Sequence, residues 1–124
     1  MDAVQQAREE RKSQLLQQLA EIMIEEQVEQ GVFLETPHYS IIERQAITLG
    51  RDLSRRAQER GAREVAANCE AEVACPACQS RCSVELERRQ VTSLDGSVEL
   101  TEAVAYCRPC RRSFFPSASR VGDR

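Results

Sequence analysis

The sequence has little of what most enzymes and membrane proteins require. Its 124 residues include one histidine and five glycines, and aromatic residues make up only 4% of the chain. No stretch is long and apolar enough to span a membrane. There is no nucleophile paired with a base and no glycine-rich loop suited to holding phosphate. We therefore expect no enzyme, no small-molecule substrate and no association with a membrane.

A secretory signal is also lacking. Residues 1–12 are polar and charged, and no apolar stretch follows them. This indicates a cytoplasmic protein whose thiols stay reduced. An even count of six cysteines can indicate a disulfide framework. Reduced thiols favour a metal site instead.

Four cysteines form two C-x-x-C pairs, Cys75-Pro76-Ala77-Cys78 and Cys107-Arg108-Pro109-Cys110, with 28 residues between them. This spacing is typical of a zinc ribbon, in which each pair folds as a tight knuckle and a β-hairpin brings the knuckles together. We predict that Cys75, Cys78, Cys107 and Cys110 bind one structural Zn²⁺. Four protein thiolates leave no open position for a catalytic water.

Other interpretations of the cysteines remain open at this point. Iron suits the same tetrahedral thiolate set as zinc. A thioredoxin-like redox motif at Cys75 is disfavoured because no βαβ pattern surrounds it. Cys82 could replace one ligand, although we favour a small buried residue there and an ordinary thiol at Cys69. The single histidine, His38, lies far from the knuckles, and we interpret it as a surface or helix-entry residue.

The ribbon should contain a hairpin between the two knuckles. Val84 and Leu86 alternate with acidic residues, and after Asp95-Gly96 the residues Val98 and Leu100 alternate with Glu99 and Thr101. Asp95-Gly96 predicts a type I′ turn. Phe114-Phe115, stopped by Pro116, predicts a short third strand. Because so small a ribbon buries little, metal binding should supply much of its folding free energy.

The residues before the ribbon predict two amphipathic helices. In the first, Leu15, Leu19 and Ile22 share one stripe, with Leu16 and Met23 beside it, and Gly31 suits the position just after the helix end. In the second, one continuous face recurs at helical spacing, formed by Ile42, Ala46, Leu49, Leu53 and Ala57. This helix begins either at Thr36-Pro37 or at a capping box on Ser40.

The predicted fold class is therefore α+β, with an N-terminal helical hairpin followed by a small antiparallel β zinc ribbon. The helical region covers residues 1–74, with helices at about 3–30 and 37–67. The ribbon covers residues 75–116, and we expect a disordered tail at 117–124. The narrow apolar stripes of the helices indicate that part of this surface is intended for another chain or for a missing domain.

Charge is distributed unevenly along a chain whose net charge is −3. Residues 1–74 hold nine basic and fourteen acidic residues, whereas residues 75–124 hold eight and six. Arg108, Arg111 and Arg112 surround the second knuckle, near Tyr106. We predict that these arginines contact nucleic acid through phosphates and base stacking, and a solvated arginine cluster is an equally open interpretation.

The same residues resemble a known family. The similarity extends over the helical lead-in Glu35-Thr36-Pro37-His38-Tyr39 and over the ribbon, where it includes Cys75-Pro76-Ala77-Cys78, Cys82, Val91-Thr92-Ser93-Leu94-Asp95-Gly96-Ser97-Val98-Glu99-Leu100 and Tyr106-Cys107-Arg108-Pro109-Cys110-Arg111-Arg112-Ser113-Phe114-Phe115-Pro116. These segments look like the zinc-ribbon region near the N-terminus of bacterial insertion-sequence transposases of the Kra type. The resemblance implies that the metal positions are Cys75, Cys78, Cys107 and Cys110.

In that family a large catalytic domain follows the ribbon, and its two aspartates and one glutamate hold Mg²⁺. Only eight residues follow Pro116 here, so no acidic triad can be transferred and we expect no transposition by this chain alone. The resemblance implies a DNA-binding or accessory module, with mobile-element ends, a full-length transposase or a second copy bound through the helices as partners. The alternative is a structural or protein-interaction zinc module, a truncated relic that does not bind DNA.

Overall fold

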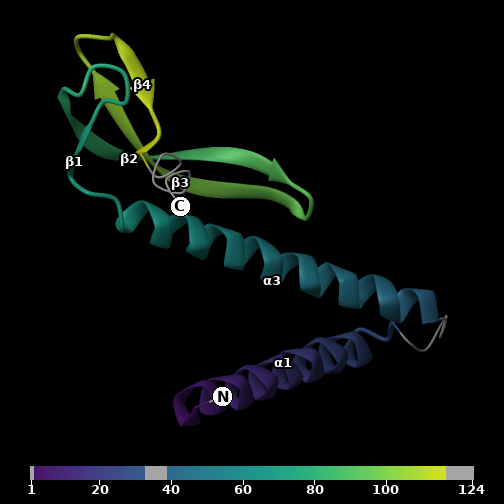
Figure 1. The fold of residues 1–124 in the computed structure, drawn as a ribbon. Coiled ribbons are helices and arrows are strands. Elements are labelled where there is room, and N and C mark those ends of the chain that lie inside the picture. Colours follow the sequence, from purple (N-terminus) through teal and green to yellow (C-terminus); the bar gives the residue numbers. More distant parts are fainter. Residues whose placement is uncertain (1, 33–38, 117–124) are drawn as a thin grey trace. The chain divides into compact units, whose positions relative to one another are not determined.

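The computed structural model describes residues 2–32 and 39–116 of the chain. Two helices, α1 and α3, precede four strands, β1 to β4, that form one antiparallel sheet (Figure 1). The predicted α+β class is therefore confirmed, with the helices first and the sheet after them.

Helix α1 covers Ala3–Glu29, close to the predicted 3–30. It starts at a capping box, because the Gln5 amide donates to the Asp2 carboxylate at 2.8 Å and the Asp2 amide donates to the Gln5 side chain at 3.3 Å. Gly31 has a φ of 73° and its amide reaches the Val28 carbonyl at 3.1 Å. Gly31 thus ends the helix, as its position in the sequence predicts.

Helix α3 covers Tyr39–Ala67. It runs without interruption through Gly50 and Gly61, although glycine weakens a helix interior. The predicted start at Thr36-Pro37, the residue His38 and the tail at 117–124 lie outside the described residues. Within the described residues, neither helix is long and apolar enough to cross a membrane.

The sheet has the order β1-β2-β3-β4, with every neighbouring pair antiparallel. The long hairpin consists of β2 (Arg81–Ser93) and β3 (Gly96–Cys107). Strand β4 (Arg112–Phe114) is the predicted third strand, shifted so that Phe115 lies just beyond it. Strand β1 (Glu72–Ala74), which pairs with the start of β2, is an addition that the sequence analysis does not predict.

The hairpin turn lies where it is predicted, but it is not of type I′. That type needs positive φ at both central residues. Ser93 pairs with Gly96, so Leu94 and Asp95 are the central residues, and neither has a positive φ. Gly96 alone takes a positive φ, 116°, and an added Cβ there would lie 3.3 Å from Arg55 Nη1. The positive φ therefore favours glycine at this position, and an added Cβ would also crowd the Arg55 side chain.

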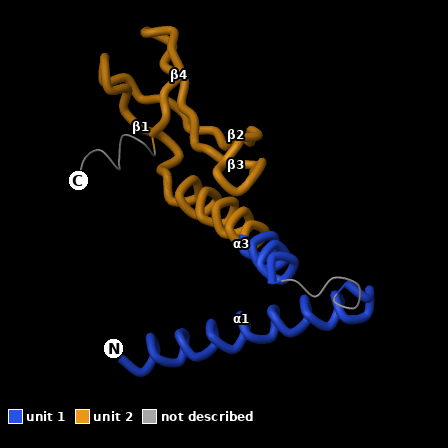
Figure 2. Tube along the Cα trace, turned by 90° about the vertical axis from the view of Figure 1, so that its right-hand side faces the viewer, with its two compact units in different colours: residues 1–50 blue, residues 51–124 orange. Residues whose placement is uncertain are grey.

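The chain forms two compact units, residues 1–50 and 51–124 (Figure 2). The second half of α3 belongs to the unit that contains the sheet. The division at residue 74, which separates the helices from the ribbon by their sequence character, stays a prediction.

Polar contacts hold the tip of the hairpin to the second half of α3. Ser54 Oγ donates to the Asp95 carboxylate at 2.5 Å, and Arg55 Nη1 donates to the Asp95 carbonyl at 2.8 Å. One turn further along α3, Glu59 Oε2 accepts the Glu99 amide at 2.8 Å. We call these residues of α3 and the hairpin tip the clasp.

The core is small. The buried apolar residues among those described are Ala66, Cys75, Cys82, Val98, Ala103, Ala105 and Cys107. None is larger than valine, so little apolar surface leaves water on folding. Cys75, Cys82 and Cys107 cluster with Ala105, and Val73, Val84 and Phe114 pack against them. The base of the sheet is thus built around cysteine sulfurs.

Candidate metal centre

The first knuckle lies between β1 and β2 and is a tight backbone turn. The Cys75 amide donates to the Ser80 carbonyl at 2.8 Å, and the Gln79 amide donates to the Cys75 carbonyl at 2.9 Å. The Ala77 amide points at Cys75 Sγ, 3.4 Å away. Gln79, which follows Cys78, has a positive φ of 68°. The turn brings the two sulfurs of the C-x-x-C pair to the same side.

The second knuckle repeats this arrangement between β3 and β4. Cys107 is the last residue of β3, and Cys110 stands two residues before β4 begins. Arg111, which follows Cys110, also has a positive φ, 55°. Each knuckle therefore reverses the chain through a left-handed residue directly after its second cysteine, and the sheet register fixes the two knuckles against each other.

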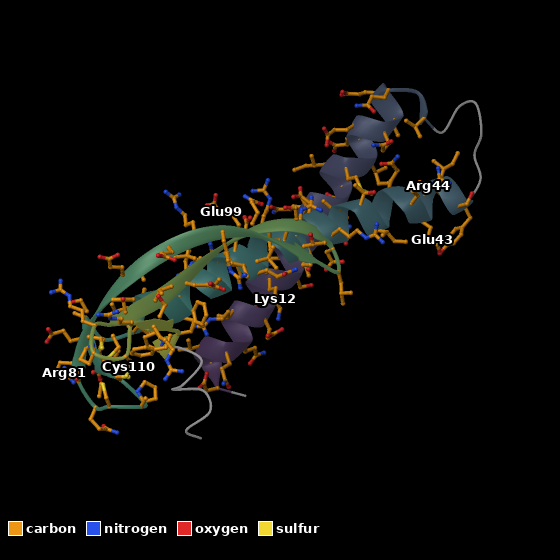
Figure 3. The ribbon with its side chains drawn as sticks, turned by 90° about the horizontal axis from the view of Figure 1, so that it is seen from above. Lys12, Glu43, Arg44, Arg81, Glu99 and Cys110 are labelled. Atoms are coloured by element: carbon orange, nitrogen blue, oxygen red, sulfur yellow. The ribbon has the colours of Figure 1, made fainter. Side chains whose placement is uncertain are left out.

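The four predicted cysteines meet at one point. All four Sγ atoms of Cys75, Cys78, Cys107 and Cys110 lie within 4.8 Å of one another. Across the two knuckles, Cys75 Sγ lies 3.9 Å from Cys110 Sγ, and Cys78 Sγ lies 3.4 Å from Cys107 Sγ. Figure 3 labels Cys110 beside the other sulfur atoms at this end of the sheet.

This geometry suits a tetrahedral metal. A Zn–S bond of about 2.3 Å implies sulfurs about 3.8 Å apart in a regular tetrahedron. The separations of 3.9 Å and 3.4 Å lie on both sides of that value. All six cysteines are free, so no disulfide competes for these sulfurs. The four cysteines can therefore hold a metal ion, and thiolate ligands select zinc or iron among common metals.

The local environment prepares the four thiols unequally. The Ser80 hydroxyl and amide lower the pKa of Cys78 to about 6. Amide groups of Cys78 and Ala77 lower the pKa of Cys75. The Cys110 amide lowers the pKa of Cys107, but burial and the neighbouring thiols outweigh it and raise the pKa overall. The local environment thus favours the thiolate form in the first knuckle and the protonated form in the second.

The two remaining cysteines stand apart from this cluster. Cys82 is buried, and its Sγ lies 3.4 Å from the Ser80 carbonyl oxygen. Its place agrees with the prediction of a small buried residue near the site. Cys69 is half-buried just after α3, with its Sγ 3.8 Å from the Val65 carbonyl oxygen. Neither belongs to the group of sulfurs that can share a metal.

The three arginines predicted to meet nucleic acid are all exposed. Arg108 shares a surface hollow of about 710 Å³ with Tyr106, Arg81, Glu85 and Glu87. Arg112 lines a separate hollow of about 200 Å³, next to Phe114 and three of the cysteines. None of the three arginines forms an ion pair with another described residue. Their guanidinium groups are therefore open to an outside anion.

Ser80 is a residue of the candidate site that the sequence analysis does not single out. Its hydroxyl lies 3.3 Å from Cys78 Sγ, and its carbonyl accepts the Cys75 amide. A small hydroxyl residue two positions after a C-x-x-C pair is the signal that could have identified it, because a hydroxyl can reach back to the last sulfur of the turn.

Comparisons with family models, with curated proteins and with solved structures found no match to this chain.

Proposed function

We propose that Cys75, Cys78, Cys107 and Cys110 bind one structural Zn²⁺ and that the chain is a transposase-derived zinc-ribbon module that binds DNA. The observation that carries the metal assignment is the meeting of four sulfurs within 4.8 Å. Zinc is favoured over iron because a closed four-cysteine shell is the usual structural zinc site. Such a site stabilises the fold and leaves no position for catalysis.

The DNA-binding part of the proposal is supported by the second knuckle. Arg108, Arg111 and Arg112 are exposed there, and the metal would fix their backbone. Half-exposed Tyr106 shares a hollow with Arg108, so a base could stack on the ring while the guanidinium meets a phosphate. Glu85 and Glu87 in the same hollow would repel further phosphates, which favours a contact with only one or two nucleotides there.

The test measures metal and DNA together. Purified protein should hold close to one zinc per chain and bind duplexes, including mobile-element ends, with an affinity that falls as salt rises. Replacing Arg108, Arg111 and Arg112 by alanine should weaken binding on every sequence. It should also reduce the log-log salt slope by up to about 0.9 per lost phosphate contact. Zinc content should not change.

The matched control replaces three arginines of α3 by alanine, Arg51, Arg56 and Arg63. This variant loses the same charge away from the knuckle, so DNA affinity should fall much less. Equal losses in the two variants would show that only net charge matters. Absence of salt-sensitive binding to any duplex or single strand would refute the DNA assignment.

The second candidate is a structural or protein-interaction module whose helices form the working surface. The observation that favours it is the exposed apolar surface of the helices, including Leu15, Ile22 and Ile47 at about half exposure. An acidic N-terminal region also disfavours contact with DNA there. Zinc binding without DNA binding, in the experiment above, would select this candidate.

A further inference from the structure

Helix α1 carries a stripe of seven residues whose chemistry changes from one end to the other. The residues follow one another at alternating spacings of four and three, the heptad spacing of a coiled-coil seam. Two are basic, three are apolar and two are acidic. We call this set the α1 stripe, and it consists of Arg8, Lys12, Leu15, Leu19, Ile22, Glu26 and Glu29.

All seven residues of the α1 stripe are exposed. Leu15 and Ile22 are each 52% exposed and Leu19 is 36% exposed. The half-buried residues of α1 are Ala20, Met23 and Gln27, which lie on a different face, since consecutive helix residues are rotated by about 100°. The stripe is therefore an exposed surface with apolar residues at its centre.

We propose that the α1 stripe pairs with the same stripe of a second copy of this chain, in antiparallel orientation. A two-fold axis close to Leu19 would place the apolar centre of one copy on the apolar centre of the other. The basic end, with Arg8 and Lys12, would then lie beside the acidic end, with Glu26 and Glu29. Each dimer gains this charge match twice because the interface is isologous.

The same charges decide against the parallel arrangement. In a parallel pair in register, Arg8 and Lys12 would face their own copies, as would Glu26 and Glu29, and like charges beside a helix seam are destabilising. Ion pairs within the chain do not prevent the antiparallel pairing of the charged residues. Lys12 contacts Glu9 at 3.0 Å (Lys12 is labelled in Figure 3), an exposed pair that can rearrange at little cost. Arg8, Glu26 and Glu29 form no ion pair with any described residue.

The inference does not depend on the metal site or on DNA binding. Its first test is self-association, measured by sedimentation velocity on the full zinc-loaded chain over a range of concentrations. The wild-type protein should dimerise reversibly. A variant with Arg8→Glu and Lys12→Glu should dimerise about tenfold more weakly or worse, because attraction at both ends of the interface becomes repulsion. Glu21→Lys, a charge reversal on the opposite face of α1, is the control and should not weaken the dimer.

The second test determines the orientation. A charge-swapped chain carries all four reversals, namely Arg8→Glu, Lys12→Glu, Glu26→Lys and Glu29→Lys. In the antiparallel arrangement the swapped chain dimerises with itself as the wild type does, and the two chains avoid each other when mixed. In a parallel arrangement the mixed pair would be the favoured one. Capture of a tagged wild-type chain from an equimolar mixture distinguishes the two results.

These variants change exposed residues only, so helix content measured by circular dichroism should stay near that of the wild type. A wild-type chain that remains monomeric up to high concentration would overturn the proposal. A dimer unaffected by the Arg8 and Lys12 reversals would overturn it too. Zinc content and DNA binding, measured separately on the same samples, report on the proposed function and not on this pairing.

Discussion

The cysteines of the two knuckles differ in how readily they give up a proton. Ser80 holds the pKa of Cys78 near 6. Contact with the Cys78 thiol raises the pKa of Cys110, with burial adding to the effect. Zinc must displace every proton that its ligands still carry, so the asymmetry determines how metal binding responds to pH.

We expect the zinc affinity to rise with pH, with a change of slope near the pKa of Cys78. At about pH 7 Cys78 is mostly thiolate, so zinc displaces protons from the other ligands, which include Cys107 and Cys110 with their raised pKa values. Below about pH 6 Cys78 is protonated too, and the affinity should fall by about one further tenfold step per pH unit. Competition with a chromogenic chelator at several pH values measures this dependence.

Ser80→Ala tests whether the Ser80 hydroxyl lowers the pKa of Cys78. Loss of the hydroxyl that contacts Cys78 at 3.3 Å should raise the pKa of Cys78 and move the change of slope to higher pH. Ser83→Ala, a nearby exposed serine on β2, is the control and should leave the slope in place. An unchanged profile in Ser80→Ala would show that the hydroxyl does not set this pKa.

Serine substitutions at three cysteines give a second prediction at the residue scale. Cys107→Ser should lose zinc and the sheet together, because Cys107 is both a member of the sulfur cluster and fully buried in the core. Cys82→Ser should keep the zinc, since Cys82 is outside the cluster, yet lose stability by about 1–3 kcal/mol for burying a hydroxyl in place of a thiol. Cys69→Ser should keep both the zinc and the stability of the wild type. Zinc content and thermal unfolding distinguish the three outcomes, and loss of zinc in Cys82→Ser would identify it as a ligand.

The sequence predicts the features that follow a repeating pattern, and it misses the short strand and the long-range polar contacts. The cysteine spacing, the alternation along Val84 and Leu86, and the stripe of α1 each reflect one repeating physical requirement, so the site, the hairpin and the helices are predictable. Strand β1 has only three residues, Glu72–Ala74, too few to show a pattern. The clasp joins Arg55 to Asp95, forty residues apart, and polar contacts at that separation leave no periodic signal.

At the scale of elements, the clasp ties a helix to a hairpin that extends well beyond the metal site. The tip of the hairpin is also braced internally, because Ser93 Oγ donates to the Gly96 carbonyl at 2.7 Å and accepts the Asp95 amide at 3.2 Å. Buried Val98 lies just beyond the tip. A metal at the four cysteines would order one end of the hairpin, and the contacts with α3 hold the other.

Arg55→Ala should therefore loosen the tip without affecting the metal. The Asp95 carbonyl loses its donor, which should cost about 1 kcal/mol in the free energy of unfolding. The neighbouring Arg56→Ala is the matched control: Arg56 is 76% exposed and pairs only with Asp52 among the described residues, so its loss should cost less than about 0.5 kcal/mol. Urea unfolding of the zinc-loaded protein measures both.

Amide hydrogen exchange shows which part of the hairpin the Arg55→Ala substitution destabilises. In Arg55→Ala the amides of Asp95 and Glu99 should exchange faster, while those of the first knuckle should not. Equal destabilisation by the two arginine variants would mean that the contact with Asp95 contributes nothing specific. Faster exchange at the knuckle would mean that the two ends of the hairpin unfold together.

At the scale of the whole molecule, the two compact units depend on different stabilising terms. Residues 1–50 contain no cysteine, and residues 51–124 contain all six. In the second unit Cys75 and Cys107 of the site belong to the buried cluster, and Cys110 packs against it. A metal bound at the site would therefore share residues with the core. In the first unit the described stabilising features are local, namely the cap of α1 and exposed short-range pairs such as Lys12–Glu9. The stripe pairing proposed above would add to them.

Chelating the metal should therefore unfold the sheet and leave much of the helix. The ribbon has no buried side chain larger than valine, too little to offset its conformational entropy without the metal. The helices carry no ligand, so their circular dichroism signal should largely persist, with some loss from the second half of α3 once the clasp has no hairpin to hold. Returning zinc should restore the sheet. Complete loss of helix on chelation would instead show that α1 and α3 depend on the ribbon as parts of one cooperative unit.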